Sequence, residues 1–379
     1  MPTPLFRKPL LPSHYSVWCE PPDESGDEVL HIVSGRRSLK LKGHSFREFY
    51  ERVVPLLDGR HDLAEIQEQT VDVFRAEDLA DSLTMLTQQG VIVEGDMSGL
   101  SEDVAARLAT QLNFFHDLTP GAAEAQAKLG GATVALVGLG GAGAATALAL
   151  AAAGIGSLRL IDALPLAVTD VYLTPFFGVE DVGRGRAEVL ERKIKASAPQ
   201  VSVSSVTAAI ESEEEVRAAI QGVDFLVCSL DAAQTNLAYK LNRVCLAEKI
   251  RWIAGSLAGT EVTVGPVVHP GESACYLCYR MRSVACAGNP EEAFAFEKHL
   301  DRRKRDDGGR RENLVFGAGL AANLVGMEVL KELTGFAETS LVGRILTIQL
   351  TDLAILRHTV LRKPWCPACF GKPEEVHAS

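Results

Sequence analysis

The sequence lacks the features that mark secreted, membrane-spanning or nucleic-acid-binding proteins. Its first residues, from Met1 to Lys8, contain no apolar segment of the kind found in signal peptides. The longest alanine-rich stretch, 144–153, ends at Gly154 and is too short to cross a bilayer. An excess of positive charge is also missing, because 38 Lys and Arg stand against 49 Asp and Glu and give a net charge of -11. We therefore expect a cytoplasmic protein that binds neither membrane nor nucleic acid.

The first 95 residues have a pattern of their own. Residues 29–33 and 38–42 alternate apolar with polar side chains around a turn that contains Gly35, which predicts a β-hairpin. Three short helical patterns follow, and residues 91–94 return as a strand. A chain of 379 residues has room for two or three domains. We expect a winged-helix-like domain at 1–95, a linker with helices at 96–129, and a larger domain at 130–379.

A glycine-rich turn defines the class of the larger domain. The strand-like run 133–137 leads into Gly138-Leu-Gly-Gly-Ala-Gly143 and then into an apolar helix at 144–153. In nucleotide-binding βαβ units such glycines permit a tight turn, close approach to phosphates and packing of the helix on the sheet. Asp162 follows the next strand, at about the distance where a carboxylate meets a ribose hydroxyl. The candidate cofactor-binding residues of this turn are Gly138, Gly140, Gly143 and Asp162.

Strand and helix patterns alternate through the rest of the chain, which predicts an α/β fold with a Rossmann-like, doubly wound sheet. Between Cys278 and Phe316 the sequence is polar and includes a charged, glycine-containing run at 301–311. We interpret this insertion as a mobile surface loop. Strands are expected at 202–206, 223–229, 253–256, 261–268, 343–350 and 355–360, and helices at 187–196, 213–220, 235–247 and 317–333.

The eight cysteines include two distant Cys-x-x-Cys pairs. Cysteines in a cytoplasmic protein are more often thiols or metal ligands than disulfides. Four thiolates suit a closed tetrahedral zinc site, which leaves no open position for catalysis. We therefore predict a structural Zn²⁺ that ties the C-terminal tail to the large domain, held by Cys275, Cys278, Cys366 and Cys369.

The other cysteines give weaker signals. Cys228 and Cys245 lie in strand and helix patterns and are expected in the core, and Cys19 carries no functional signal. Cys286 lies in the polar region 283–313 and is either an incidental thiol or a nucleophile for a thioester or persulfide. The sequence leaves its role open.

Together, the glycine-rich turn, the acid after the second strand and the paired cysteines resemble the ubiquitin-activating-type adenylation superfamily over about residues 103–372. Its members bind ATP and Mg²⁺, activate a C-terminal carboxylate as an acyl adenylate, and form homodimers. The resemblance places Asp162 on the ribose and Asp231 on magnesium. It also shows departures from the family pattern: Asp170 stands for asparagine, Leu173 for arginine, Arg186 for lysine, and Thr110 for the second arginine of a motif at 107–111.

These departures affect the charge chemistry. Losing one preorganised group that stabilises developing charge costs about 3–4 kcal/mol in the transition state. Leu173 removes such a cation, and Asp170 adds a negative charge beside the expected phosphates. The pattern indicates a fold that has lost adenylating activity, with ATP and Mg²⁺ as doubtful cofactors at Gly138, Gly140, Gly143, Asp162, Arg186 and Asp231.

The N-terminal region resembles the peptide-recognition domain of ribosomal-peptide biosynthesis, although a transcriptional winged helix is an alternative. That domain binds a leader peptide by adding a strand to a sheet edge beside a helix. The candidate peptide-binding residues are Ser38, Leu39, Lys40, Leu41 and Lys42 on the strand and Leu79, Leu83 and Leu86 on the helix. These three leucines have ordinary core packing as their alternative.

Combined, the two resemblances imply a partner protein of YcaO-type cyclodehydratases. Such a protein binds the leader of a precursor peptide and presents it for azoline formation, while the cyclodehydratase uses ATP. The alternative is an active adenylyltransferase that acts on a peptide or on the C-terminus of a ubiquitin-like sulfur carrier.

Overall fold

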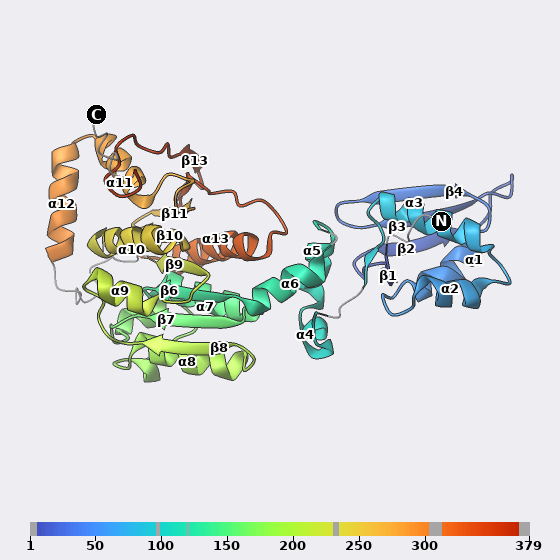
Figure 1. Cartoon of the computed structure of the whole chain (residues 1–379), viewed down its shortest axis with the longest axis horizontal. Helices are drawn as coiled ribbons and strands as arrows, with labels where there is room; N and C mark the ends of the chain where they lie inside the picture. The colour runs from blue at the N-terminus through green and yellow to red at the C-terminus, as the bar shows by residue number, and fades with distance from the viewer. Residues whose placement is uncertain (1–5, 96–98, 120, 230–234, 303–312, 371–379) are drawn as a thin grey trace, which may run out of the picture. The chain divides into compact units, whose positions relative to one another are not determined.

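The computed structural model describes residues 6–95, 99–119, 121–229, 235–302 and 313–370. The chain divides into two compact units, Met1–Ala127 and Lys128–Ser379. Both are shown in Figure 1.

The first unit contains two small sheets. Strands β2 (Ser16–Glu20), β3 (Glu28–Val33) and β4 (Ser38–Gly43) form an antiparallel sheet in the order β2-β3-β4. The predicted hairpin is therefore confirmed, but the sequence interpretation missed β2. The expected returning strand is shorter, β5 (Val93–Glu94), and pairs with β1 (Pro9–Leu10) in a second sheet.

Helical segments pack on the three-stranded sheet. After α1 (Phe46–Glu48) come a π-helical turn, η1 (Phe49–Val53), and a 3-10 turn, η2 (Val54–Leu56), where a single helix was expected. Helix α2 (Leu63–Thr70) begins with a capping box in which Asp62 and Glu65 each accept the other's backbone N–H. Helix α3 (Ala76–Gln88) completes the layer.

The core of this unit corrects one expectation. Leu79, Leu83 and Leu86 of α3 are only 1%, 7% and 2% exposed. They belong to one buried cluster with Leu30 and Ile32 of β3. These leucines are core residues that hold α3 against the sheet, so they do not line an open groove.

The linker at 96–129 contains helices, as expected. They are α4 (Glu102–Arg107), α5 (Ala109–His116) and α6 (Ala122–Gly131). Ser101 caps α4, because its side chain accepts the backbone N–H of Val104.

An eight-stranded sheet forms the centre of the second unit. Its order is β13-β12-β11-β10-β9-β6-β7-β8, and Figure 1 shows these strands stacked from β8 at the bottom to β13 at the top. The strands from β10 to β8 run parallel, as expected of a doubly wound fold, whereas β11, β12 and β13 are antiparallel. The strands are β6 (Thr133–Val137), β7 (Ser157–Ile161), β8 (Ser202–Val206), β9 (Phe225–Ser229), β10 (Arg251–Ala258), β11 (Glu261–Val268), β12 (Arg344–Gln349) and β13 (Ile355–Thr359).

Helices cover this sheet. Helix α13 (Val315–Thr334) packs against α7 (Gly141–Ala152) and against β10 and β11. Helices α9 (Glu213–Ala219) and α10 (Thr235–Glu248) contribute to the cluster that buries Cys228, Cys245 and Trp252, so these two cysteines are core residues as expected. Helix α8 (Arg186–Ser197) packs on β7 and β8, and two 3-10 turns, η3 (Val168–Tyr172) and η4 (Val179–Asp181), precede it.

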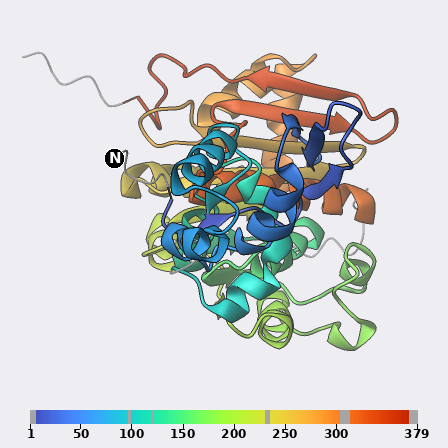
Figure 2. The same cartoon turned by 90° about the vertical axis from the view of Figure 1, so that its right-hand side faces the viewer.

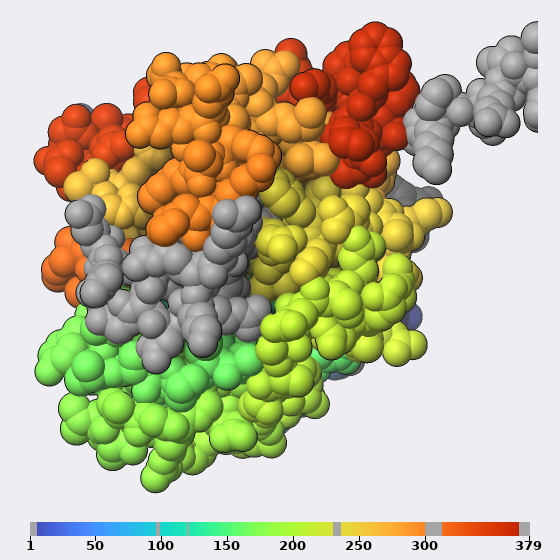
Figure 3. Space-filling view, turned by 90° about the vertical axis from the view of Figure 1, so that its left-hand side faces the viewer, coloured from blue at the N-terminus to red at the C-terminus, as the bar shows by residue number. Residues whose placement is uncertain are grey.

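The expected mobile loop between Cys278 and Phe316 is wrong over most of its length. Residues 276–302 form α11 (Tyr276–Ala285) and α12 (Pro290–Arg302), which are joined by an ion pair between Arg280 and Glu297. Figure 3 shows these helices as the orange surface beside α10, which is yellow. Residues 303–312 lie outside the described residues, and exposed Cys286 ends α11.

Among the described residues, no helix combines the length and the apolarity needed to span a bilayer.

One buried histidine in the first unit lacks polar partners. His116, at the end of α5, is 5% exposed, and neither ring nitrogen has a hydrogen-bond partner among the described residues. Burial, helped by the nearby His14, lowers the pKa of His116 to about 4. The ring is therefore neutral at pH 7, since a charge there would have no compensation.

We predict that His116 makes the protein sensitive to acid. The unfolded chain takes up this proton near its ordinary pKa of 6.5, but the folded chain does so only near 4. Stability linked to this group is therefore complete above about pH 7 and falls as the pH drops from about 6.5 towards 4, by about 3 kcal/mol in total. Urea unfolding at several pH values will measure it. His116→Phe should flatten the profile, and an unchanged profile in that variant would contradict the assignment.

Candidate functional site

The glycine-rich turn joins the end of β6 to the start of α7. Gly138 has φ +83°, a conformation that favours glycine, and α7 begins at Gly141 after Gly140 as its N-cap. A Cβ at Gly143 would lie 2.0 Å from the carbonyl oxygen of Gly138, and one at Gly138 would lie 2.4 Å from that of Ser229. The turn is therefore backbone packed on backbone. It leaves the first N–H groups of α7 in the geometry that phosphate-binding turns use.

Asp162, directly after β7, supports this turn. Its Oδ2 accepts the N–H of Leu139 at 2.8 Å, and its Oδ1 accepts the N–H of Leu164 at 2.8 Å. The side chain is only 7% exposed, and Nη1 of Arg186 lies 3.5 Å from Oδ2. The carboxylate is thus engaged with the turn and with a cation.

Asp170 and Arg186, two of the residues that depart from the family pattern, are in direct contact. Arg186, at the start of α8, donates from Nε to Oδ2 of Asp170 at 3.0 Å and from Nη2 to Oδ1 at 2.8 Å. Asp170 is 3% exposed, and its Oδ2 also accepts the N–H of Ala167 at 2.8 Å. Such bidentate pairs are among the strongest hydrogen-bonded ion pairs. The cation at the expected lysine position is therefore balanced by the acid at the expected asparagine position.

The remaining candidate residues take no part in this ion pair, although the backbone N–H of Leu173 donates to the carbonyl oxygen of Asp170 at 3.1 Å. Leu173, at the expected arginine position, packs against the first turn of α7, because a Cβ on Gly141 would lie 2.8 Å from the oxygen of Leu173. Thr110 is exposed on α5, in the other unit. Asp231, the expected magnesium ligand, falls within 230–234 and lies outside the described residues.

Taken together, these contacts retain the backbone frame of a nucleotide site but change its charges. Arg186 faces two carboxylates, Asp162 and Asp170, so this cluster has a net charge of about -1 before any phosphate approaches. A triphosphate binding beside Arg186 would have to compete with the bidentate pair, which costs several kcal/mol to break when buried. The residues at this position fit ATP poorly.

The four predicted zinc ligands gather in one cluster. Their Sγ atoms all lie within 4.8 Å of one another, with 3.8 Å between Cys275 and Cys278, 3.8 Å between Cys275 and Cys366, and 3.6 Å between Cys278 and Cys369. Four sulfurs placed tetrahedrally at about 2.3 Å from zinc lie about 3.8 Å apart. Burial raises the pKa of the Cys275 thiol, so thiolates here need a cation. The cluster fits a closed Zn²⁺ site.

Hydrogen bonds hold in place the two chain segments that carry these cysteines, one around Cys275 and Cys278 and the other, the C-terminal arm, around Cys366 and Cys369. The backbone N–H of Lys363 donates to Sγ of Cys278 at 3.3 Å, and the N–H of Tyr276 donates to Oδ1 of Asn242 at 3.0 Å. Arg362 donates to the carbonyl oxygen of Gly271 at 2.9 Å, which links the C-terminal arm to the loop before Cys275.

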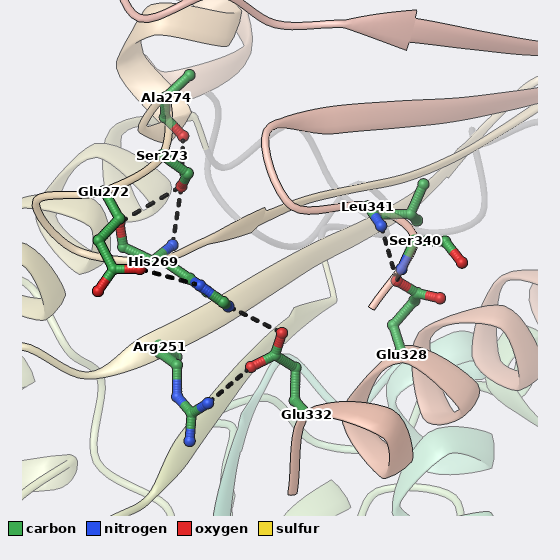
Figure 4. Close-up of polar contacts among 9 residues, drawn as sticks. All are labelled: Arg251, His269, Glu272, Ser273, Ala274, Glu328, Glu332, Ser340 and Leu341. Atoms are coloured by element: carbon green, nitrogen blue, oxygen red, sulfur yellow. Dashed lines mark hydrogen bonds and ion pairs between the residues drawn. The ribbon is translucent and has the colours of Figure 1, made fainter. Parts of the chain in front are cut away.

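A buried charge network holds the other side of that loop (Figure 4). Glu332 of α13, 2% exposed, accepts from Nε2 of His269 at 2.8 Å and from Nη1 of Arg251 at 2.9 Å. Burial tends to raise the pKa of Glu332, but the hydrogen bond from His269 and the neighbouring charges of His269 and Arg251 outweigh it and lower the pKa. Sequence reasoning missed this network, since its members are far apart in the chain.

Strand β4 supplies the backbone groups expected for peptide binding. The N–H of Ser34 donates to the carbonyl oxygen of Arg37, so bonded pairs alternate along β3 and β4. The backbone groups of Leu39 and Leu41 therefore face β3. Those of Ser38, Lys40 and Lys42 point to the open edge, because β4 pairs with no strand but β3 in the part of the chain that the structure describes. The Lys42 ammonium contacts Asp23 at 2.9 Å, and both leucine side chains pack partly buried against the core.

The parallel strands, the glycine-rich turn and the cysteine cluster define an adenylation-type α/β fold. The ThiF family matches residues 109–368, and the chain belongs to this family. HesA of a Nostoc species is 28% identical over 248 residues, which cover 65% of this chain and 87% of HesA. The sulfur carrier protein adenylyltransferase of Thermus thermophilus is 25% identical over 256 residues, covering 66% and 87%.

Solved structures share this architecture. MccB of Escherichia coli, solved with ATP, has a TM-score of 0.70 at 19% identity and covers 95% of this chain and 99% of MccB. The microcin C7 biosynthetic enzyme MccB in complex with N-formylated MccA has a TM-score of 0.69 at 18% identity, with the same coverage. At such identities the likeness shows the fold, including both units.

We predict that the cysteine cluster binds one zinc ion that stabilises the second unit. Native mass spectrometry should find one Zn²⁺ per chain, and the double variant Cys366→Ser, Cys369→Ser should lose it. Because bound metal contributes directly to folding, the melting temperature should fall by about 5–10 °C. Cys19→Ser is the matched control and should keep both zinc and stability. Equal zinc content in the double variant and the parent would show that the cluster is no metal site.

Proposed function

We propose that this protein binds the leader peptide of a ribosomally made precursor and presents it to a YcaO-type cyclodehydratase for thiazoline or oxazoline formation. In this role the ThiF-type unit is a scaffold without adenylating activity of its own. The N-terminal unit receives the peptide along β4, and the cysteine cluster holds a structural Zn²⁺. The cyclodehydratase supplies the ATP-dependent step.

The observation that carries the loss of activity is the pair between Asp170 and Arg186. Adenylation brings a triphosphate beside a carboxylate and depends on cations that are available to both. Arg186 is instead bound by the carboxylate of Asp170 at 2.8 Å and lies 3.5 Å from Asp162. Leu173 adds an apolar side chain against the start of α7, where the family pattern calls for arginine.

Peptide binding is supported by the open edge of β4 and by the likeness to MccB. MccB has been solved in complex with MccA, which is a peptide, and its fold matches 95% of this chain, the N-terminal unit included. An added strand gains main-chain hydrogen bonds from the outward groups of Ser38, Lys40 and Lys42, and side chains then provide specificity. Because Leu79, Leu83 and Leu86 are core residues, we place the contacts on the strand rather than on these leucines.

We further propose that the chain forms a homodimer through an exposed apolar segment. Residues 168–182 carry five large apolar side chains that are 40% or more exposed, which is far more than a solvated surface of this length usually shows. They are Val168, Tyr172, Phe176, Val179 and Val182.

The second candidate function is an active adenylyltransferase that acts on a peptide or on a sulfur-carrier C-terminus. The intact glycine-rich turn favours it, as do relatives that carry this activity in their names. In that case Asp231 would hold Mg²⁺, and ligand binding would have to draw Arg186 away from Asp170.

A pyrophosphate exchange assay separates the two functions. We predict that the chain, with ATP, Mg²⁺ and the precursor peptide, exchanges pyrophosphate no faster than background, because Arg186 is engaged. Asp170→Asn, which restores the family residue and releases Arg186, should strengthen ATP binding in a fluorescence assay, and its melting temperature reports the stability lost with the buried pair. Strong exchange by the parent that Asp231→Ala abolishes would instead establish the adenylyltransferase.

A proline on β4 tests the peptide edge. We predict that Lys40→Pro, which removes an outward N–H without breaking the bonds to β3, weakens binding of the precursor's leader peptide at least about tenfold, or about 1.4 kcal/mol. Lys40→Ala keeps the N–H and should change binding less than threefold. Fluorescence anisotropy with the leader encoded beside this gene provides the measurement. Unchanged binding by Lys40→Pro would place peptide recognition elsewhere.

A further inference from the structure

The outermost strand of the eight-stranded sheet exposes both of its faces. Among the described strands, β13 pairs only with β12, at the upper edge of the sheet in Figure 2. Successive side chains of a strand point to opposite faces of the sheet. Ile355 and Leu356 are 63% and 55% exposed, so neither face is covered at these residues. Natural proteins usually cover or shorten such an edge because it pairs readily with other strands.

The register shows which backbone groups of β13 are available. The N–H of Val360 donates to the oxygen of Gly343, and the N–H of Gln349 donates to the oxygen of Ala354. Since bonded pairs alternate along an antiparallel ladder, every second residue of β13 bonds to β12. The backbone groups of Leu356 and His358 face β12, and those of Ile355, Arg357 and Thr359 face outward.

The charge of this edge is opposite to that of the protein. The chain has a net charge of -11, yet residues 355–365 contain two Arg and one Lys and no Asp or Glu. Arg344 pairs with Thr359, two residues beyond Arg357, so both arginines lie on one face of the sheet. Within the part of the chain that the structure describes, neither arginine forms an ion pair.

A cavity follows directly after the strand. It has a volume of about 290 Å³ and is lined by Arg362, Lys363, Pro364 and Phe370. Arg362 donates hydrogen bonds to the carbonyl oxygens of Gly271 and Cys369, and these bonds connect the lining of the cavity to the cysteine cluster. Trp365, which follows Pro364 in the sequence, is 78% exposed. The cavity thus combines two cationic side chains with aromatic surface.

We propose that β13 and this cavity form a docking site for an extended acidic segment of a second protein. The segment adds a ninth strand through the outward groups of Ile355, Arg357 and Thr359. Its carboxylates face Arg344 and Arg357, and the chain continues towards the cavity. This site is separate from the peptide edge of β4 and does not depend on the proposed function.

Fluorescence anisotropy with the full-length protein tests this proposal. The probe is a fluorescein-labelled eight-residue peptide in which Glu and Val alternate, and its companion carries Lys in place of Glu. We expect the acidic probe to bind at least about tenfold more tightly than the basic one and to weaken as salt rises, since exposed charges are screened. Equal binding of the two probes would overturn the proposal.

Matched variants locate the probe. Thr359→Pro removes an outward N–H and should weaken binding at least about tenfold, whereas Thr359→Val keeps the N–H and should bind like the parent. Lys40→Pro on β4 should also leave the probe's affinity unchanged, because it alters the other edge. Binding that survives Thr359→Pro, or that is lost in Lys40→Pro, would contradict the assignment to β13.

If Thr359→Pro disturbs the sheet, a charge reversal at Arg357 provides an independent test of the site. The melting temperature and zinc content of each variant report folding. Arg357→Glu should weaken the acidic probe and strengthen the basic one, and Arg357→Gln should fall between Arg357→Glu and the parent. The same affinities in Arg357→Glu and the parent would exclude this strand as the site.

Discussion

The second unit depends on close packing of backbone against backbone at the glycine-rich turn. β6, the start of α7 and the end of β9 approach so closely that a single methyl group on Gly138 or Gly143 would collide with a carbonyl oxygen. Asp162 reinforces the turn by accepting the N–H of Leu139. The glycines of this turn have a structural role, because they allow α7 to pack closely on the sheet. A chain can therefore keep the glycines of a nucleotide site after nucleotide chemistry has been lost, and the glycines alone are weak evidence of activity.

The charged groups around the frame carry the functional information. The family's asparagine and lysine would place a neutral amide and a point charge at positions 170 and 186, whereas Asp170 and Arg186 place a carboxylate opposite a planar guanidinium. Together they form a bidentate pair with both hydrogen bonds near 3 Å. A triphosphate that used Arg186 would have to compete with the carboxylate of Asp170. The two positions therefore have to be considered as a unit.

Local pattern was sufficient to predict much of the fold. β8 and β11 have the expected bounds, because apolar alternation and β-branched residues depend only on neighbours in sequence. The antiparallel direction of β11–β13 was missed, since strand direction depends on the path of the chain between strands. The sequence analysis predicted a loop at α12 because the segment is rich in charged residues. The structure shows a helix there whose Phe294 and Phe296 are more than half exposed. At the site, spacing was enough to predict the cysteine cluster, but the contact of Asp170 with Arg186 joins a 3-10 turn to a helix start and needs the tertiary structure.

The sheet edges at β4 and β13 differ in how they are protected from unwanted pairing. On β4 the outward residues are Ser38, Lys40 and Lys42, and Lys42 is held by Asp23, so its charge is partly neutralised. On β13 Arg357 follows two exposed apolar residues, Ile355 and Leu356, and forms no ion pair among the described residues. Charged side chains on an edge repel strands of like charge but attract strands of opposite charge. The chain has a net charge of -11, so charge alone would let cations at this edge attract a second copy of the chain as well as another acidic protein. Strand pairing adds a second requirement, which is an extended segment with free backbone groups. Few folded surfaces offer such a segment, so the combination of charge and backbone makes the edge selective.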